Sequence, residues 1–169
     1  MFKSKYTVFF CTIISCGSAF SGEMPTSSTK DFCDLAASVG YPSRGFRANS
    51  NGCSSEMVDV PGSASSNGTS NNIAYYAIGD SYGSGRIGKI SIILNINNTK
   101  NKSRSLDELI SVANYVGYQV LGGIPKEFSG FVKSGKNAKW QSGAWLLEIK
   151  NDKWSTGMGQ DIKVMFYPK

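Results

Sequence analysis

Hydrophobic and polar residues alternate over a long stretch in the middle of the chain. Residues 86–97 place apolar side chains at every second position, which is the side-chain period of a β-strand: Ile90, Ile92, Leu94 and Ile96. Residues 73–80 form a second apolar run, and the glycine-bearing sequence GDSYGSG separates the two. Two strands around a short glycine-rich loop indicate an antiparallel hairpin.

The same period of two returns near the C-terminus. Residues 143–150 carry Trp145, Leu147 and Ile149 on one face, and residues 160–169 carry Ile162, Val164 and Phe166 on one face. A polar, glycine-bearing sequence, NDKWSTGMG, joins the two stretches. We therefore expect a second antiparallel hairpin.

Three other stretches show the spacing i, i+3, i+4, i+7 of an amphipathic helix. They are residues 28–39, residues 105–123 and a shorter stretch from Pro125 to Gly135. The first two open with a capping-box pattern, Ser28 with Asp31 and Ser105 with Glu108. Glycine follows each stretch at the position where helices end.

The order helix, hairpin, two helices, hairpin predicts an α+β fold. We expect an antiparallel sheet of about four to five strands, built from the two hairpins and covered by three helices. Residues 42–72 show no sustained period, so we expect at most one short strand there, near residues 56–60. The Ser-, Gly- and Asn-rich residues 61–72 have the composition of a flexible loop.

The start of the chain has the three-part layout of a secretory signal peptide. Lys3 and Lys5 precede an uncharged apolar run at residues 7–16, and small residues follow up to Ser21. The run is too short to remain as a membrane span, which takes about 20 apolar residues. We therefore predict a signal peptide over residues 1–21 and a single exported domain over residues 22–169, in the periplasm or outside the cell.

A second way of processing this segment stays open. The sequence IISC at residues 13–16 resembles the lipobox of bacterial lipoproteins. By that resemblance Cys16 would be lipidated, and the protein would be anchored to a membrane. Cleavage after Ser21 instead releases a free protein.

The remaining cysteines fit an oxidising compartment. After cleavage at Ser21 only Cys33 and Cys53 are left, an even number. Joining them closes a loop worth about 3 kcal/mol in the chain-entropy account of disulfide stabilisation. We predict a structural disulfide between these two residues.

The sequence YGSGRIGKIS at residues 82–91 has the glycine spacing of nucleotide-binding loops. Its glycines spell G-x-G-x-x-G: Gly83, Gly85 and Gly88. Such phosphate loops open a helix whose N–H groups face the phosphate, whereas this one opens the strand predicted over residues 86–97. Its lysine is also followed by isoleucine, not by the Ser or Thr that reaches magnesium. We interpret the stretch as a hairpin turn and expect no nucleotide and no other cofactor.

The composition leaves little for catalysis. The chain has no histidine, which excludes Ser–His–Asp and Cys–His arrangements and the usual zinc ligand sets. The carboxylates fall at helix starts, in loops and beside lysines, where acidic residues are ordinary. We predict a non-catalytic protein without a metal. The net charge of +6 is modest, and nucleic acid is a poor partner for an exported protein.

Two groups of residues are candidates for binding. Aromatic and charged residues in the predicted loops, Tyr82, Arg86 and Trp154, are candidate contacts for a protein partner. Trp154 has an equal alternative, in which it folds back onto the sheet. The sequence KNKSR supplies a second group, Lys100, Lys102 and Arg104, for an anionic surface.

These features support two hypotheses about function. The first is a non-catalytic exported bacterial protein that works through contact with another envelope or secreted protein, such as an inhibitor, an immunity protein or an envelope adaptor. The second is a module of the envelope that binds lipid or glycan.

Overall fold

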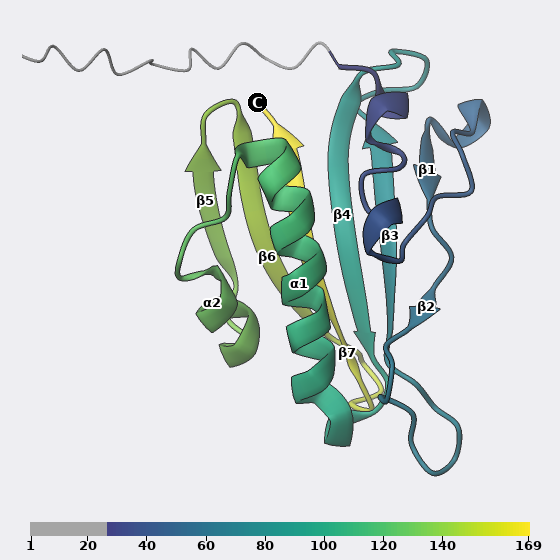
Figure 1. Cartoon of the computed structure of the whole chain (residues 1–169), viewed down its shortest axis with the longest axis vertical. Coiled ribbons are helices and arrows are strands. Elements are labelled where there is room, and N and C mark those ends of the chain that lie inside the picture. The colour runs from purple at the N-terminus through teal and green to yellow at the C-terminus, as the bar shows by residue number, and fades with distance from the viewer. Residues whose placement is uncertain (1–26) are drawn as a thin grey trace, which may run out of the picture.

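The computed structural model describes residues 27–169, which form an α+β fold around a seven-stranded antiparallel sheet (Figure 1). The strand order is β1-β3-β4-β7-β6-β5, and β2 pairs with β3 beside β1. The predicted signal peptide and Cys16 lie outside the described residues. The fold class therefore agrees with the sequence prediction, while the strand count and the first helix do not.

Both predicted hairpins are present. The first joins β3 (Asn72–Gly79) to β4 (Ile87–Ile96), and the second joins β6 (Trp145–Lys153) to β7 (Gln160–Pro168). Antiparallel pairing of β4 with β7 fuses the two hairpins into one sheet. Apolar side chains meet at this seam on the side that faces the helices, in the pairs Ile90–Phe166, Ile92–Val164 and Leu94–Ile162.

The prediction of four to five strands was wrong because two short strands were missed, β1 (Gly52–Ser54) and β5 (Ala138–Ser142). A third short strand, β2 (Val58–Asp59), lies where the sequence predicted one, near residues 56–60. A strand of two or three residues is too short to show a period of two, and β5 carries a single large apolar residue, Trp140. Pairing with β3 and β6 forms these strands, so the decisive contacts are tertiary.

Two α-helices match the prediction: α1 (Lys102–Leu121) and α2 (Phe128–Ser134). The capping box predicted at Ser105 and Glu108 was wrong, because α1 begins three residues earlier, after a 3-10 helix at Thr99–Asn101. Ser105 is fully buried inside α1, where its hydroxyl accepts a hydrogen bond of 2.8 Å from Asn71 Nδ2. A serine that resembled a cap is thus part of the core.

The helix predicted over residues 28–39 was also wrong. This segment forms two short 3-10 helices, Thr29–Phe32 and Ala37–Val39, and a third follows at Ala48–Ser50. The capping box of Ser28 and Asp31 is present, so the start was predicted correctly. A short helix gains little from its own hydrogen bonds. Cys33 and Tyr41 tie the segment to the rest of the fold, through the disulfide and a bond to Glu108.

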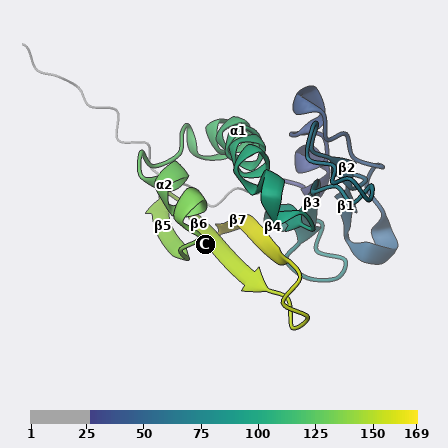
Figure 2. The ribbon, with the colours of Figure 1, turned by 90° about the horizontal axis from the view of Figure 1, so that it is seen from below.

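The core lies between one face of the sheet and a helical layer. Figure 2 shows α1 and the N-terminal 3-10 helices on the same side of the sheet. Every second residue of the long strands is buried beneath this layer, and α1 contributes a stripe to it: Leu106, Leu109, Val112, Ala113 and Val116. The layer ends at the lower edge of Figure 1, where α1 begins, and a polar pocket lies beside the start of this helix.

The predicted disulfide is present. Cys33 and Cys53 are joined, with their Cα atoms 5.7 Å apart, and both are buried. The bond fixes the N-terminal 3-10 helices to β1, at the edge of the sheet. It is compatible with an oxidising compartment.

Candidate functional site

The glycine-rich sequence at residues 82–91 spans the turn between β3 and β4 and the first five residues of β4. Gly83 and Gly85 have φ of 79° and 69°, a left-handed conformation that glycine adopts without strain. Asp80 and Arg86 close the turn with an ion pair of 2.9 Å. Tyr82 stands at the tip and is 84% exposed. The turn leads into β4 and not into a helix, so it lacks the geometry of a phosphate loop.

The three residues predicted to contact a protein partner do not lie together. Tyr82 and Arg86 precede the start of β4, whereas Trp154 lies in the β6–β7 loop near the other end of β4. Gly159 packs against both the Trp154 ring and the carbonyl of Ile96, the last residue of β4. The ten residues of β4 separate these places by roughly 30 Å. The sheet therefore presents two separate candidate contacts.

Trp154 is half-buried. Its indole Nε1 donates a hydrogen bond of 2.8 Å to Asp161 Oδ1, and its ring packs against Gly159, where an added Cβ would come within 2.5 Å of a ring carbon. The indole thus folds back on the start of β7, as in the alternative reading of the sequence.

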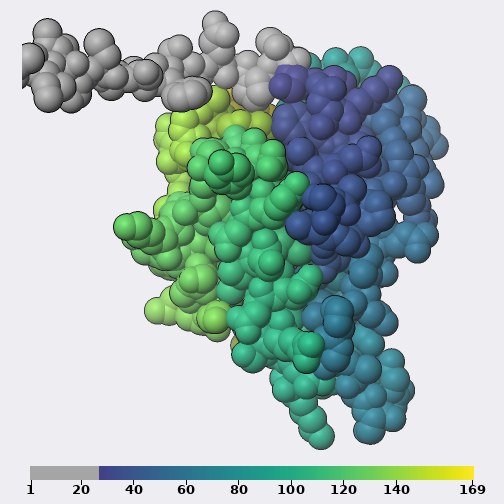
Figure 3. Space-filling view, viewed as in Figure 1, coloured from purple at the N-terminus to yellow at the C-terminus, as the bar shows by residue number. Residues whose placement is uncertain are grey.

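The basic residues of KNKSR point to three different places. Lys100 lines a polar hollow of about 560 Å³ against the loop of residues 61–71, which lies beside the start of α1 at the lower end of the molecule (Figure 3). The guanidinium of Arg104 lies over Gly62, where an added Cβ would come within 2.8 Å of Nη1. Lys102 lines a larger pocket on another side of the helix. These three residues therefore do not form one patch.

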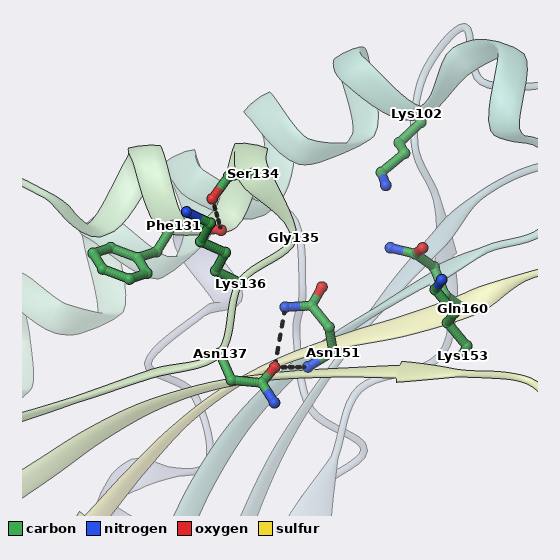
Figure 4. Close-up of a pocket in the computed structure, with 9 residues that line it drawn as sticks. All are labelled: Lys102, Phe131, Ser134, Gly135, Lys136, Asn137, Asn151, Lys153 and Gln160. Atoms are coloured by element: carbon green, nitrogen blue, oxygen red, sulfur yellow. Dashed lines mark hydrogen bonds between the residues drawn. The ribbon is translucent and has the colours of Figure 1, made fainter.

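The larger pocket has a volume of about 700 Å³. It opens where the start of α1 and the end of α2 meet the end of β6 and the start of β7 (Figure 4). We call it the lysine pocket, after three of the residues that line it. The lining consists of Lys102, Phe131, Ser134, Gly135, Lys136, Asn137, Asn151, Lys153 and Gln160.

The lysine pocket continues the core layer with polar side chains. Lys102 precedes Leu106 by four residues, so it falls on the buried stripe of α1. On β6, Asn151 and Lys153 follow the buried Ile149 at steps of two and share its face of the sheet. Gln160 continues the buried face of β7 in the same way. Figure 4 shows Lys102 pointing from α1 toward Gln160 and Lys153.

A pair of amides forms the floor beside β5. Pairing between β5 and β6 ends at Ala138 and Ile149. Beyond this pair, the Asn137 side chain provides the acceptor that a backbone carbonyl of β5 would otherwise offer to β6. Its Oδ1 accepts a hydrogen bond of 2.8 Å from the backbone N–H of Asn151. The Asn151 Oδ1 is buried and accepts no hydrogen bond from any of residues 27–169. In Figure 4 this oxygen is turned away from Asn137, toward the helical layer.

The lysine pocket has no acidic residue in its lining. Across residues 27–169, none of the ion pairs involves Lys102, Lys136 or Lys153. The nearest acids in the sequence, Asp152 and Asp161, alternate with the lining residues along β6 and β7, so they face the opposite side of the sheet. There they pair with lysines of that face, which leaves the pocket positive.

The opposite face is electrostatically balanced by itself. Asp152 accepts a hydrogen bond of 2.8 Å from Lys163 Nζ, which holds the pKa of Asp152 below its usual value. Lys150 lies 3.4 Å from the same carboxylate. Strand alternation thus separates a neutral network on one face from a cationic pocket on the other.

The residues that line the pocket include no acid and no cysteine. Among residues 27–169, no group of three or more Cys, Asp and Glu side chains lies close enough to hold a metal ion. On the helical side, Asp107 of α1 is engaged in an ion pair of 2.9 Å with Lys133. The chemistry that the pocket offers is the binding of an anion by ammonium and amide groups.

Comparison with known proteins gives no relative: no protein-family model matches the chain, and neither the curated proteins nor the solved structures contain a match. Within residues 27–169, no helix has the length and apolar character needed to cross a membrane. The site must therefore be interpreted from its own residues.

Sequence reasoning found one residue of the lysine pocket, Lys102, and missed the others. The signal was present in the strand pattern. On β6 and β7 the buried face continues for one or two further steps with polar residues, Asn151, Lys153 and Gln160. Polar residues at positions that should face the core indicate that the core has ended and a site has begun.

Proposed function

We propose that this chain is a non-catalytic exported bacterial protein that binds an anionic ligand of the cell envelope in the lysine pocket. The observation that carries the proposal is the grouping of Lys102, Lys136 and Lys153 in one pocket whose lining has no acidic residue. Figure 4 shows the side chains of Lys102 and Lys153 at one end of the pocket and that of Lys136 at the other, beside Ser134, so an anion in the pocket meets positive charge at both ends.

Export is supported by the disulfide and by the signal-like start of the chain. The Cys33–Cys53 bond fits the periplasm or the cell exterior, where disulfides persist. In that setting the abundant anionic ligands are carboxylated or phosphorylated envelope components. A pocket of about 700 Å³ holds one or two sugar-sized groups.

Removal of the three charges tests the proposal. The variant K102Q/K136Q/K153Q keeps the length of the side chains and removes the positive field. The matched control, K30Q/K89Q/K169Q, removes the same charge from lysines outside the pocket. Galacturonate and inorganic phosphate serve as probes, titrated into labelled protein and followed by NMR shift changes.

We expect wild type and control to bind at least one probe through pocket residues, with an affinity that falls as salt rises. The pocket variant should bind with an affinity about tenfold or more lower than wild type, because the modest contributions of three partly exposed charges add up. Absence of binding by wild type, or equal binding by both variants, would contradict the proposal.

A second candidate function is contact with a protein partner through the β3–β4 turn. It is favoured by the 84% exposure of Tyr82 at the tip of a turn that an ion pair holds closed. Exposed tyrosines on ordered loops are frequent anchors of interfaces. Tyr118 on α1 is 68% exposed and offers a matched control.

A photo-crosslinking residue placed at position 82 or at position 118 tests this second function in intact cells. We expect a discrete crosslinked species from position 82 that R86A weakens, and none from position 118. Identical products from both positions would count against the turn as a contact site.

A further inference from the structure

A second hollow adjoins the lysine pocket on the far side of α2's last turn. It has a volume of about 420 Å³ and is lined by Lys126, Glu127, Ser129, Gly130, Phe131, Ser134 and Lys136. Three of these residues, Phe131, Ser134 and Lys136, also line the lysine pocket. The two hollows therefore share a wall, and a ligand longer than one group can occupy both.

We propose that the two hollows are adjacent subsites for an acidic oligosaccharide. This inference rests on the proposed function and names its ligand class. An acidic sugar occupies the lysine pocket, and the next sugar of the chain lies over Phe131 in the second hollow.

The buried Asn151 Oδ1 favours acidic sugars over anions that carry no hydrogen-bond donor. A carbonyl oxygen buried without a partner needs a donor, and leaving such an acceptor unmet is unfavourable. The internal phosphates of a polyphosphate chain and ionised carboxylates only accept hydrogen bonds at neutral pH. A sugar acid brings hydroxyl donors beside its carboxylate, so it can satisfy Asn151 and the lysines together.

The second hollow has a different chemical character. Phe131 is half-buried, and its ring is held edge-on by Trp140 with centroids 5.3 Å apart, so the ring is fixed before any ligand arrives. A fixed aromatic ring offers an apolar surface to the C–H face of a sugar. Lys126, Glu127 and Ser129 surround it with donors and acceptors for hydroxyl groups.

Gly130 lines this hollow and leaves space where a side chain would lie. A Cβ built on Gly130 meets no atom within 4 Å, and the residue has ordinary helical backbone, so a side chain there would extend into free space. Among the residues of α2, Gly130 is thus a position at which a larger residue fills the hollow without disturbing the core. This gives a steric test that leaves the lysines untouched.

The experiment measures binding of galacturonate, of its linear tetramer and of tripolyphosphate by calorimetry to wild type, G130L and K126Q. We expect the tetramer to bind wild type about tenfold or more tighter than the monomer, because the second sugar binds next to an already bound one. G130L should lower tetramer affinity to the level of the monomer and leave monomer affinity unchanged. K126Q removes a charge from the second hollow without adding bulk, and it should lower the affinity for the tetramer by about two- to fivefold.

The outcomes separate the two proposals. If galacturonate binds in the lysine pocket but the tetramer binds no better, or if G130L and K126Q both leave tetramer affinity intact, the second subsite is wrong while the proposed function stands. Tripolyphosphate that binds as tightly as the tetramer would overturn the sugar assignment alone. If no probe binds and the lysine substitutions change nothing, the proposed function itself fails.

Discussion

The hydroxyl of Tyr41 donates a hydrogen bond of 3.0 Å to the carboxylate of Glu108. Tyr41 follows the second 3-10 helix, and Glu108 lies on α1, so the bond joins the N-terminal segment to the helix that covers the sheet. Burial of the tyrosine, and then the negative charge of Glu108, raise the pKa of Tyr41 far above its usual value. The fold thus favours the neutral hydroxyl.

The first prediction concerns alkaline pH. A tyrosine whose folded pKa is raised stabilises the protein fully below its unfolded pKa of about 10, and that stability is lost as pH rises further. We therefore expect the free energy of unfolding to fall above about pH 10. Y41F should be less stable by about 1 kcal/mol at neutral pH and should show a shallower alkaline decline.

Urea denaturation at a series of pH values measures both effects. Burial also raises the pKa of Tyr75, so part of the alkaline decline should remain in Y41F. An alkaline slope that is the same in wild type and Y41F would show that the Tyr41–Glu108 bond does not couple folding to pH.

The second prediction concerns Asn71, a fully buried amide between the loop of residues 61–71 and α1. Its Nδ2 donates to the Asn98 carbonyl at 3.0 Å and to Ser105 Oγ at 2.8 Å, and its Oδ1 accepts from the Asn97 and Asn98 amides. N71A leaves these groups buried without partners, so it should lower the free energy of unfolding by about 3 kcal/mol or more.

The matched control is S66A, at an exposed serine of the same loop that makes no hydrogen bond within the described residues. It should change stability by less than about 0.5 kcal/mol. Chemical denaturation of both variants makes the comparison, and a cost at N71A no greater than at S66A would refute a structural role for the amide network.

The third prediction concerns the disulfide. Native protein should contain no free thiol at Cys33 or Cys53, because the two sulfur atoms are bonded and buried. C33A/C53A should lose about 3 kcal/mol, mainly because its unfolded chain regains the freedom that the crosslink removes. Thiol titration in denaturant, before and after reduction, checks the bond, and thermal unfolding checks its contribution. A free thiol in the unreduced protein would contradict the prediction.

The fourth prediction compares two glycines in helices. At Gly117 an added Cβ would come within 2.3 Å of Ile124 Cγ1, whereas at Gly130 it would meet nothing within 4 Å. G117A should therefore destabilise the protein by about 1–3 kcal/mol through overpacking. G130A should stabilise it by about 0.5–1 kcal/mol, because alanine favours the helix over glycine. Thermal unfolding measures both, and changes of the same sign would argue against the packing of α1 on Ile124.

The long elements were predictable because each carries its own period. The strands β4, β6 and β7 alternate over nine or ten residues, β3 is an apolar run of eight residues, and α1 shows a helical stripe over five turns or more. Short elements carry too few residues for a period. That is why β1 and β5 were missed. Residues 28–39 show a helical spacing of apolar residues but form two short 3-10 helices.

Ser105 shows how a correct local rule can fail. Its spacing from Glu108 fits a capping box, but α1 starts at Lys102, and the Ser105 hydroxyl accepts from Asn71 in the core. Asn71 lies 34 residues away in the sequence. No local pattern contains that partner, so the use of the serine could not be read from its neighbours.

Local periodicity and residue count were enough to predict the buried faces of β4, β6 and β7, the course of α1 and α2, and the pairing of two cysteines. That Lys102, Lys136 and Lys153 share a pocket depends on tertiary packing. Pairing of β4 with β7 joins two hairpins that are distant in the sequence, and packing of α1 across them brings its first turn over the ends of β6 and β7. Charges from three separate segments meet only because that packing fixes them in space.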